Sequence, residues 1–205
     1  MTKKSSFVSA LAVLVVPALA MAQGTPSWTV QMGGAASADV APGDWSGTLS
    51  AILDAAGHGV GGWQGALQSS DNSVFKFGDP PVTMTAPGFA QSDIVFDQTS
   101  VGGPLGAEVS VFAISGADRP SFNQEALQFN VMSTRPLVIG EWFDFWIAES
   151  DAQPGHFLTN STPEGAAGIP FGQPTAFRLH VIPEPASALL LIGALPFVMR
   201  RRRTA

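Results

Sequence analysis

The residues best suited to chemistry in this 205-residue chain are Trp142, Asp144 and Trp146. If the stretch around them is a β-strand, successive side chains point to opposite faces, so these three residues share one face. Their indoles would stand about 13 Å apart and could stack on sugar rings, while the carboxylate bonds a hydroxyl. The pattern therefore has two interpretations, a strand that is packed on both faces and a carbohydrate-binding platform. Trp63, which lies among glycines, is a second candidate for an exposed indole.

No motif of a hydrolase is present in the sequence. The three histidines, His58, His156 and His180, form neither a pair four residues apart nor the H-E-x-x-H pattern of zinc proteases. Ser46 lacks the G-x-S-x-G spacing of a nucleophile elbow. Because catalytic triads are recognised by geometry rather than by spacing, a secreted hydrolase stays the third hypothesis. We predict that the protein is not an enzyme and that it has no catalytic residue.

The acidic residues raise one metal hypothesis, a structural calcium ion. Calcium takes about six to eight oxygen ligands, often from loops. The alternative is that the Asp and Asn side chains cap turns, and we expect no other cofactor and no other metal. The tightest oxygen clusters, none of which matches an EF-hand loop, are Asp71-Asn72-Ser73, Asp93 with Asp97, and Asp144 with Glu149 and Asp151.

The last 23 residues form a segment of their own. A helix built from the apolar run of fourteen residues would be about 21 Å long, shorter than the hydrocarbon core of about 30 Å. Arginines behind it would stay on the cytoplasmic face. The segment is therefore marginal as a permanent span and sufficient as a temporary anchor; an ordinary membrane helix and a buried core helix are the alternatives. Its three parts are Pro183, Glu184 and Pro185, then the apolar residues 186–199, then Arg200, Arg201, Arg202 and Arg203.

In this order and at this position, the three parts resemble the PEP-CTERM sorting signal. That signal belongs to exported bacterial proteins that are processed by exosortase, an integral-membrane enzyme. The resemblance covers about a ninth of the chain, and Pro196 inside the apolar run is a small departure from the family pattern. It implies that Pro183, Glu184 and Pro185 are recognised by an exosortase. It also implies a bacterium with a Gram-negative-type envelope, usually one that makes exopolysaccharide.

Residues 1–22 have the layout of a signal peptide. Lys3 and Lys4 precede an apolar region at 7–19, and Ala20 and Ala22 supply the small residues that a signal peptidase reads. We expect cleavage after Ala22, with a retained signal anchor as the alternative. Residues 23–182 then form one exported domain of about 160 residues, which is long enough for a hydrophobic core.

This domain is strongly acidic. It holds four of the ten Lys and Arg residues and fifteen of the sixteen Asp and Glu residues, which leaves a net charge of −11. Such a charge argues against nucleic acid and anionic membrane surfaces as partners. The absence of cysteine excludes disulfides, thiol nucleophiles and thiolate metal sites.

Apolar and polar residues alternate over short stretches of the domain, and Gly, Pro and Asp cluster between them. No stretch carries a capped pattern of period 3.6, so the sequence predicts an all-β fold, a single jelly-roll-like β-sandwich. Residues 78–81 predict a turn and residues 160–173 a long surface loop. The expected strands lie at 28–32, 48–53, 74–77, 94–96, 108–114, 127–132, 137–147 and 175–182. In the last two, the expected inward residues are Phe143, Phe145 and Ile147, and Phe177, Leu179 and Val181.

Together these features favour a non-enzymatic protein of the bacterial cell surface or extracellular matrix. We expect a signal peptidase to release it, the inner membrane to hold it transiently, and an exosortase to cleave it near Pro183, Glu184 and Pro185. The second hypothesis is a carbohydrate-binding module for exopolysaccharide that uses Trp142 and Trp146.

Overall fold

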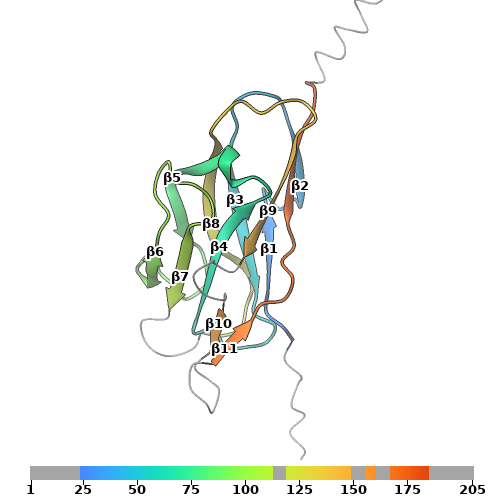
Figure 1. The fold of residues 1–205 in the computed structure, drawn as a ribbon. Coiled ribbons are helices and arrows are strands. Elements are labelled where there is room, and N and C mark those ends of the chain that lie inside the picture. The colour runs from blue at the N-terminus through green and yellow to red at the C-terminus, as the bar shows by residue number, and fades with distance from the viewer. Residues whose placement is uncertain (1–23, 113–118, 149–155, 160–166, 185–205) are drawn as a thin grey trace, which may run out of the picture.

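Twelve strands and two short 3-10 helices form the described part of the computed structural model, which covers residues 24–112, 119–148, 156–159 and 167–184 (Figure 1). The strands lie in two sheets that pack face to face, so the fold is the predicted all-β sandwich. The first sheet contains, in spatial order, β1 (Ser27–Gln31), β3 (Ser46–Asp54), β8 (Asn123–Ser133) and β5 (Phe75–Met84).

The second sheet has eight strands. Its main path is β11 (Ala167–Pro170), β10 (His156–Thr159), β4 (Gly62–Ser69), β9 (Trp142–Ala148), β12 (Phe177–Val181) and β2 (Ser37–Val40). In addition β7 (Glu108–Phe112) pairs with β4, and β6 (Ile94–Asp97) pairs with β7. The named strands pair antiparallel except β12 and β2, which run parallel. The 3-10 helices η1 (Asn72–Val74) and η2 (Gln91–Asp93) precede β5 and β6.

Period-two sequence patterns explain the strands that face the core. In β9 and β12, Phe143, Phe145, Ile147, Phe177, Leu179 and Val181 are buried on the faces that the pattern predicted them to share, and the residues between them point outward. The inner faces of both sheets supply one continuous apolar core. Burial of this core removes apolar surface from water, which contributes a stabilising free energy of roughly 25 cal/mol per Å². This hydrophobic effect is the main force that holds the sheets together.

Several sequence predictions are wrong. Trp63 is not an exposed indole, because only 1% of it is exposed and its ring packs edge-on against Trp28 at 6.1 Å. Residues 78–81 lie inside β5 rather than in a turn, although the ladder to β8 shifts register there, where Pro80 and Pro81 lack the N–H that a ladder needs. The expected loop at 160–173 contains β11. The expected strand at 137–147 begins only at Trp142.

The two ends of the described chain lie at opposite ends of the sandwich. The described chain enters before β1 at the lower end of Figure 1 and leaves after β12 at the upper end. The predicted signal peptide, with Ala20 and Ala22, lies outside the described residues, as do Pro185, the apolar run and Arg200 to Arg203. No helix within the described ranges has the length and apolar character to cross a bilayer.

Candidate functional site

The outward residues of three neighbouring strands gather on one surface of the second sheet, which we call the outer face. The pairing register places Arg178 beside Asp144 and Ser37, and His180 beside Trp142 and Asp39. Because alternate side chains of a strand share a face, these polar and aromatic groups stand next to one another. The outer face consists of Trp142, Asp144, Trp146, Arg178, His180 and Asp39.

Asp144 and Arg178 form a two-point ion pair across β9 and β12. Arg178 Nε donates to Asp144 Oδ1 at 2.7 Å, and Nη2 donates to Oδ2 at 3.0 Å. These hydrogen bonds lower the pKa of the Asp144 carboxyl below its usual value, against the opposing effect of partial burial. The carboxylate that the sequence assigned to a sugar hydroxyl is therefore already bound to a guanidinium.

The indole of Trp142 is largely open to solvent, with 62% of the residue exposed. The guanidinium carbon of Arg178 lies 4.9 Å from the centre of its ring, within the range of a cation–π contact. His180 lies 6.2 Å away, and its Nδ1 is 3.2 Å from Asp39 Oδ1. Arg178 thus holds Asp144 and Trp142 in one fixed group.

Trp146 is half-buried and lies at the far end of the outer face. It lines a hollow of about 300 Å³ together with Trp28, Phe171 and Pro174. The structure therefore places Trp142, Asp144 and Trp146 on one face, and the alternative of a strand buried on both faces is wrong for Trp142. Sequence reasoning missed Arg178, His180 and Asp39 as members of this group. It predicted that Arg178 and His180 lie on the face opposite the apolar residues of their strand, but it could not predict which residues of β9 they lie beside.

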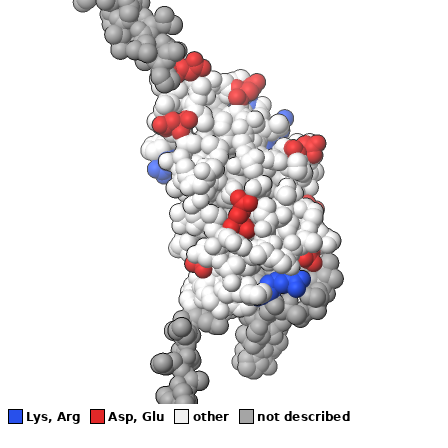
Figure 2. Space-filling model, turned by 180° about the vertical axis from the view of Figure 1, so that it is seen from behind, with Lys and Arg blue, Asp and Glu red and all other residues white. Residues whose placement is uncertain are grey.

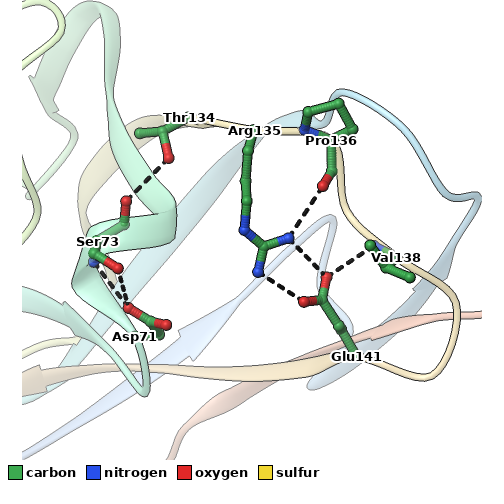
Figure 3. Close-up of polar contacts among 7 residues, drawn as sticks. All are labelled: Asp71, Ser73, Thr134, Arg135, Pro136, Val138 and Glu141. Carbon is green, nitrogen blue, oxygen red and sulfur yellow. Dashed lines mark hydrogen bonds and ion pairs between the residues drawn. The ribbon is translucent and has the colours of Figure 1, made fainter.

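The loop between β8 and β9 is closed by a second ion pair (Figure 3). Arg135 Nη2 donates to Glu141 Oε1 at 2.7 Å, and Glu141 Oε2 accepts from the backbone N–H of Val138 at 2.8 Å. Thr134 Oγ1 donates to the carbonyl of Ser73 at 2.9 Å, which ties the loop to η1. The loop is therefore held in one shape at the end of the sandwich where β12 finishes.

Part of the predicted sorting motif is visible at this same end. Ile182 donates its N–H to the carbonyl of Val40 at 2.9 Å and completes the last contact with the sheet. Pro183 and Glu184 follow and are exposed. The first two residues of the motif are therefore accessible directly beyond the final strand.

The candidate calcium carboxylates are occupied by local contacts. Asp71 caps η1 by accepting from the N–H of Ser73 at 3.0 Å, and Asp93 accepts from the N–H of Ala90 at 2.8 Å. Asp97 accepts from the N–H of Thr99 at 2.7 Å. These are the turn-capping contacts that the sequence offered as the alternative; Glu149 and Asp151 lie outside the described residues.

Carboxylates on the described surface do not form a metal-binding group. Figure 2 shows the carboxylates of the face seen from behind standing apart among uncharged residues. Across the described ranges, no three His, Asp or Glu side chains are grouped so that they could hold a metal ion. His58 lies away from the outer face, and its Nε2 is 2.9 Å from the carbonyl oxygen of Gly24.

Acid should weaken the contacts of the outer face and of the β8–β9 loop. Hydrogen bonds from Arg135, and then from Val138, hold the pKa of Glu141 below its usual 4.5, and Arg178 holds the pKa of Asp144 below 3.8. A carboxyl group whose pKa is lower in the folded chain than in the unfolded chain stabilises the fold at pH values above its unfolded-state pKa. This stabilisation is lost as the pH falls through the folded-state pKa. We expect melting temperature to be flat near neutrality and to fall below about pH 4.5.

Thermal melts of wild type and of Glu141→Gln at several pH values check this prediction. The variant cannot lose a carboxylate at position 141, so its melting temperature should decline less steeply with acid. Because both ion pairs are largely exposed, the difference should be small. Identical acid slopes for the two proteins would show that the Arg135–Glu141 pair does not contribute.

No family model matches the sequence, and no curated protein is significantly similar to it. Several solved cohesin modules have a similar fold. One is the sixth cohesin of scaffoldin B from Acetivibrio cellulolyticus in complex with a Cel5 dockerin; it has a TM-score of 0.55 and 10% identity, over 77% of this chain and 99% of the matched chain.

Two further structures agree with this result. The seventh type I cohesin of ScaB from Pseudobacteroides cellulosolvens has a TM-score of 0.54 and 8% identity, over 78% of this chain and 94% of the matched chain. A type I cohesin–dockerin complex from Clostridium thermocellum has a TM-score of 0.54 and 6% identity, over 78% of this chain and 95% of the matched chain. At such identities the similarity concerns the fold, and it confirms the jelly-roll-like β-sandwich.

Proposed function

We propose that this chain is a non-enzymatic exported protein whose β-sandwich is displayed on the bacterial surface or in the extracellular matrix. A signal peptidase removes residues 1–22, and the apolar residues 186–199 hold the precursor in the inner membrane. An exosortase then recognises Pro183, Glu184 and Pro185 and separates the domain from the tail. The host is a bacterium with a Gram-negative-type envelope.

The observation that carries this proposal is the position of the motif relative to the fold. The sheet ends at Ile182, and the next two residues are exposed and outside any strand. Pro183 cannot donate to a ladder and favours an extended residue before it. The first two residues of the motif are thus accessible at one end of the sandwich, opposite the end at which the chain enters before β1 (Figure 1). A dockerin bound to the similar cohesin supports a binding role for the sandwich.

The experiment compares two strains of an exosortase-encoding host, one with the enzyme and one without it. A short epitope placed after Ala205 reports the tail, and an antibody against the sandwich reports the domain. We expect the epitope to be lost from the envelope-associated domain only where the enzyme is present. Retention of the epitope in both strains would refute processing.

A second candidate function, binding of exopolysaccharide, is favoured by one observation. Trp142 exposes 62% of its surface on the same face as Trp146. Stacking on a sugar ring would use the indole, and the paired Asp144 and Arg178 would offer hydrogen-bonding groups to hydroxyls beside it.

Replacement of Trp142 with alanine should weaken retention on the host's exopolysaccharide about tenfold, since an aromatic contact contributes roughly 0.5–1.5 kcal/mol beyond area burial. Affinity electrophoresis measures the retention. Trp142→Phe keeps a ring and should retain most of the binding, whereas Val95→Ala changes an exposed side chain elsewhere and should change nothing. Unchanged retention of a folded Trp142→Ala protein would eliminate this candidate.

A further inference from the structure

Three large apolar side chains are exposed together at one end of the sandwich. Val138 is 59% exposed, Ile139 54% and Trp142 62%; we call these three residues the apolar tip. Val138 and Ile139 belong to the turn that leads into β9, where Glu141 donates its N–H to the carbonyl of Val138 at 3.1 Å, and Trp142 is the first residue of β9. Side chains of this size gain stability when they leave water for an apolar environment.

The shape of the apolar tip is fixed by the loop that carries it. The Glu141 carboxylate binds the Val138 N–H on one side and the Arg135 guanidinium on the other (Figure 3). Leu137, the residue before the tip, is buried and pairs with Gly43 through two backbone hydrogen bonds of 2.8 and 3.0 Å. Because Leu137 points inward and is anchored, Val138 and Ile139 are held outward. The charges of the loop are paired with each other.

The apolar tip lies beside the point where the chain leaves the fold. Gly140 donates its N–H to the carbonyl of Val181 at 2.9 Å, and Val181 donates to the carbonyl of Glu141 at 2.9 Å. Figure 1 shows the β8–β9 loop and the end of β12 together at the upper end of the sandwich. The same end therefore carries both the exposed apolar residues and the start of the sorting motif.

The length of chain beyond the fold sets the distance to the membrane. Only residues 183–185 separate Ile182 from the apolar run that begins at Ala186. Three extended residues span at most about 10 Å. While residues 186–199 are in the bilayer, as the proposed function requires, the end of the sandwich that bears the apolar tip must therefore lie close to the lipid surface.

We propose that the apolar tip inserts into the outward-facing leaflet of the membrane that holds the tail, and so orients the domain during processing. This proposal rests on the membrane insertion of the tail in the proposed function. Indoles favour the boundary between headgroups and acyl chains, and apolar side chains there reach about 5–10 Å into the interface. The net charge of the domain, −11, favours contact with neutral over anionic lipid.

Because the sequence contains no cysteine, a fluorophore can be attached at one introduced cysteine. The unprocessed chain is purified from a host without exosortase and reconstituted into phosphatidylcholine vesicles that contain a lipid-borne nitroxide quencher. An environment-sensitive fluorophore is attached at a single cysteine, in Ile139→Cys or in the control Val95→Cys. Val95 matches the tip in exposure, 61%, but lies in β6, away from the exit of the chain.

We expect the emission of the fluorophore at position 139 to shift to shorter wavelength. A nitroxide high on the acyl chain should quench this emission more strongly than a deep one. The fluorophore at position 95 should not be quenched. If the chain floats with the vesicles but position 139 is unquenched, the apolar tip does not enter lipid and this inference is wrong. If the chain does not float with the vesicles, the membrane anchor fails, and both this inference and the proposed function are overturned.

Discussion

Replacement of Phe145 with alanine should lower the free energy of unfolding by about 3–5 kcal/mol. Phe145 lies in β9, is completely buried, and has three aromatic neighbours, with ring centres at 4.8 Å for Phe75, 6.1 Å for Phe177 and 6.2 Å for Trp45. Phe75 and Trp45 belong to the opposite side of the sandwich from β9 and β12. Removal of the ring therefore leaves a cavity between the sheets, where the surrounding side chains can collapse only in part.

The loss would be a large fraction of total stability, since domains of this kind are stable by only about 5–15 kcal/mol. Urea denaturation of the sandwich measures it, and the midpoint should fall while the slope of the transition stays the same. Val138→Ala is the matched control, because Val138 is exposed and its truncation should change stability by less than about 0.5 kcal/mol. A loss below about 1 kcal/mol for Phe145→Ala would contradict the packing described.

Replacement of Arg200, Arg201, Arg202 and Arg203 with serine should reduce removal of the tail by more than about tenfold. Each arginine costs roughly 2.5–3.5 kcal/mol at the centre of a bilayer, so four together stop the apolar run from passing through. Without them the run is too short to remain in place, and the sorting motif is no longer held at the membrane enzyme. The precursor should accumulate with its tail intact.

Replacement of the same four arginines with lysine is the control for this experiment. Lysine keeps the positive charge that sets orientation, so processing should remain close to that of wild type. An immunoblot that resolves precursor from mature chain measures both variants in the same host. If the serine variant were processed as fast as the lysine variant, the positive cluster would have no role in retention.

The predicted fold agrees with the structure where the sequence pattern reports burial on one face. In β12 the alternation of Phe177, Leu179 and Val181 with polar residues gave the strand and its inward face, and β9 behaves in the same way. β4 was missed because Gly62, Gly65 and Ala66 are buried along with its large residues, so alternation is absent. β2 was missed because it is short, largely exposed and pairs with β12 from the far end of the chain.

The candidate site shows the same limit. Trp142, Asp144 and Trp146 could be placed on one face because side-chain direction within a strand follows from period two. Their partner Arg178 could not be found, because its distance from Asp144 depends on the register between β9 and β12, which is fixed by contacts across the whole sheet. Exposure of Val138 and Ile139 was not predicted, because residues 137–147 have the pattern of one strand, whereas a turn from Val138 to Glu141 precedes β9.

The most direct test of the central claim is the intact mass of the mature protein isolated from the envelope of its own host. We expect a chain that begins near Gln23 and ends close to Pro183, Glu184 and Pro185, without Arg200 to Arg203. A mature chain that still ends in Arg203, Thr204 and Ala205 would contradict this claim.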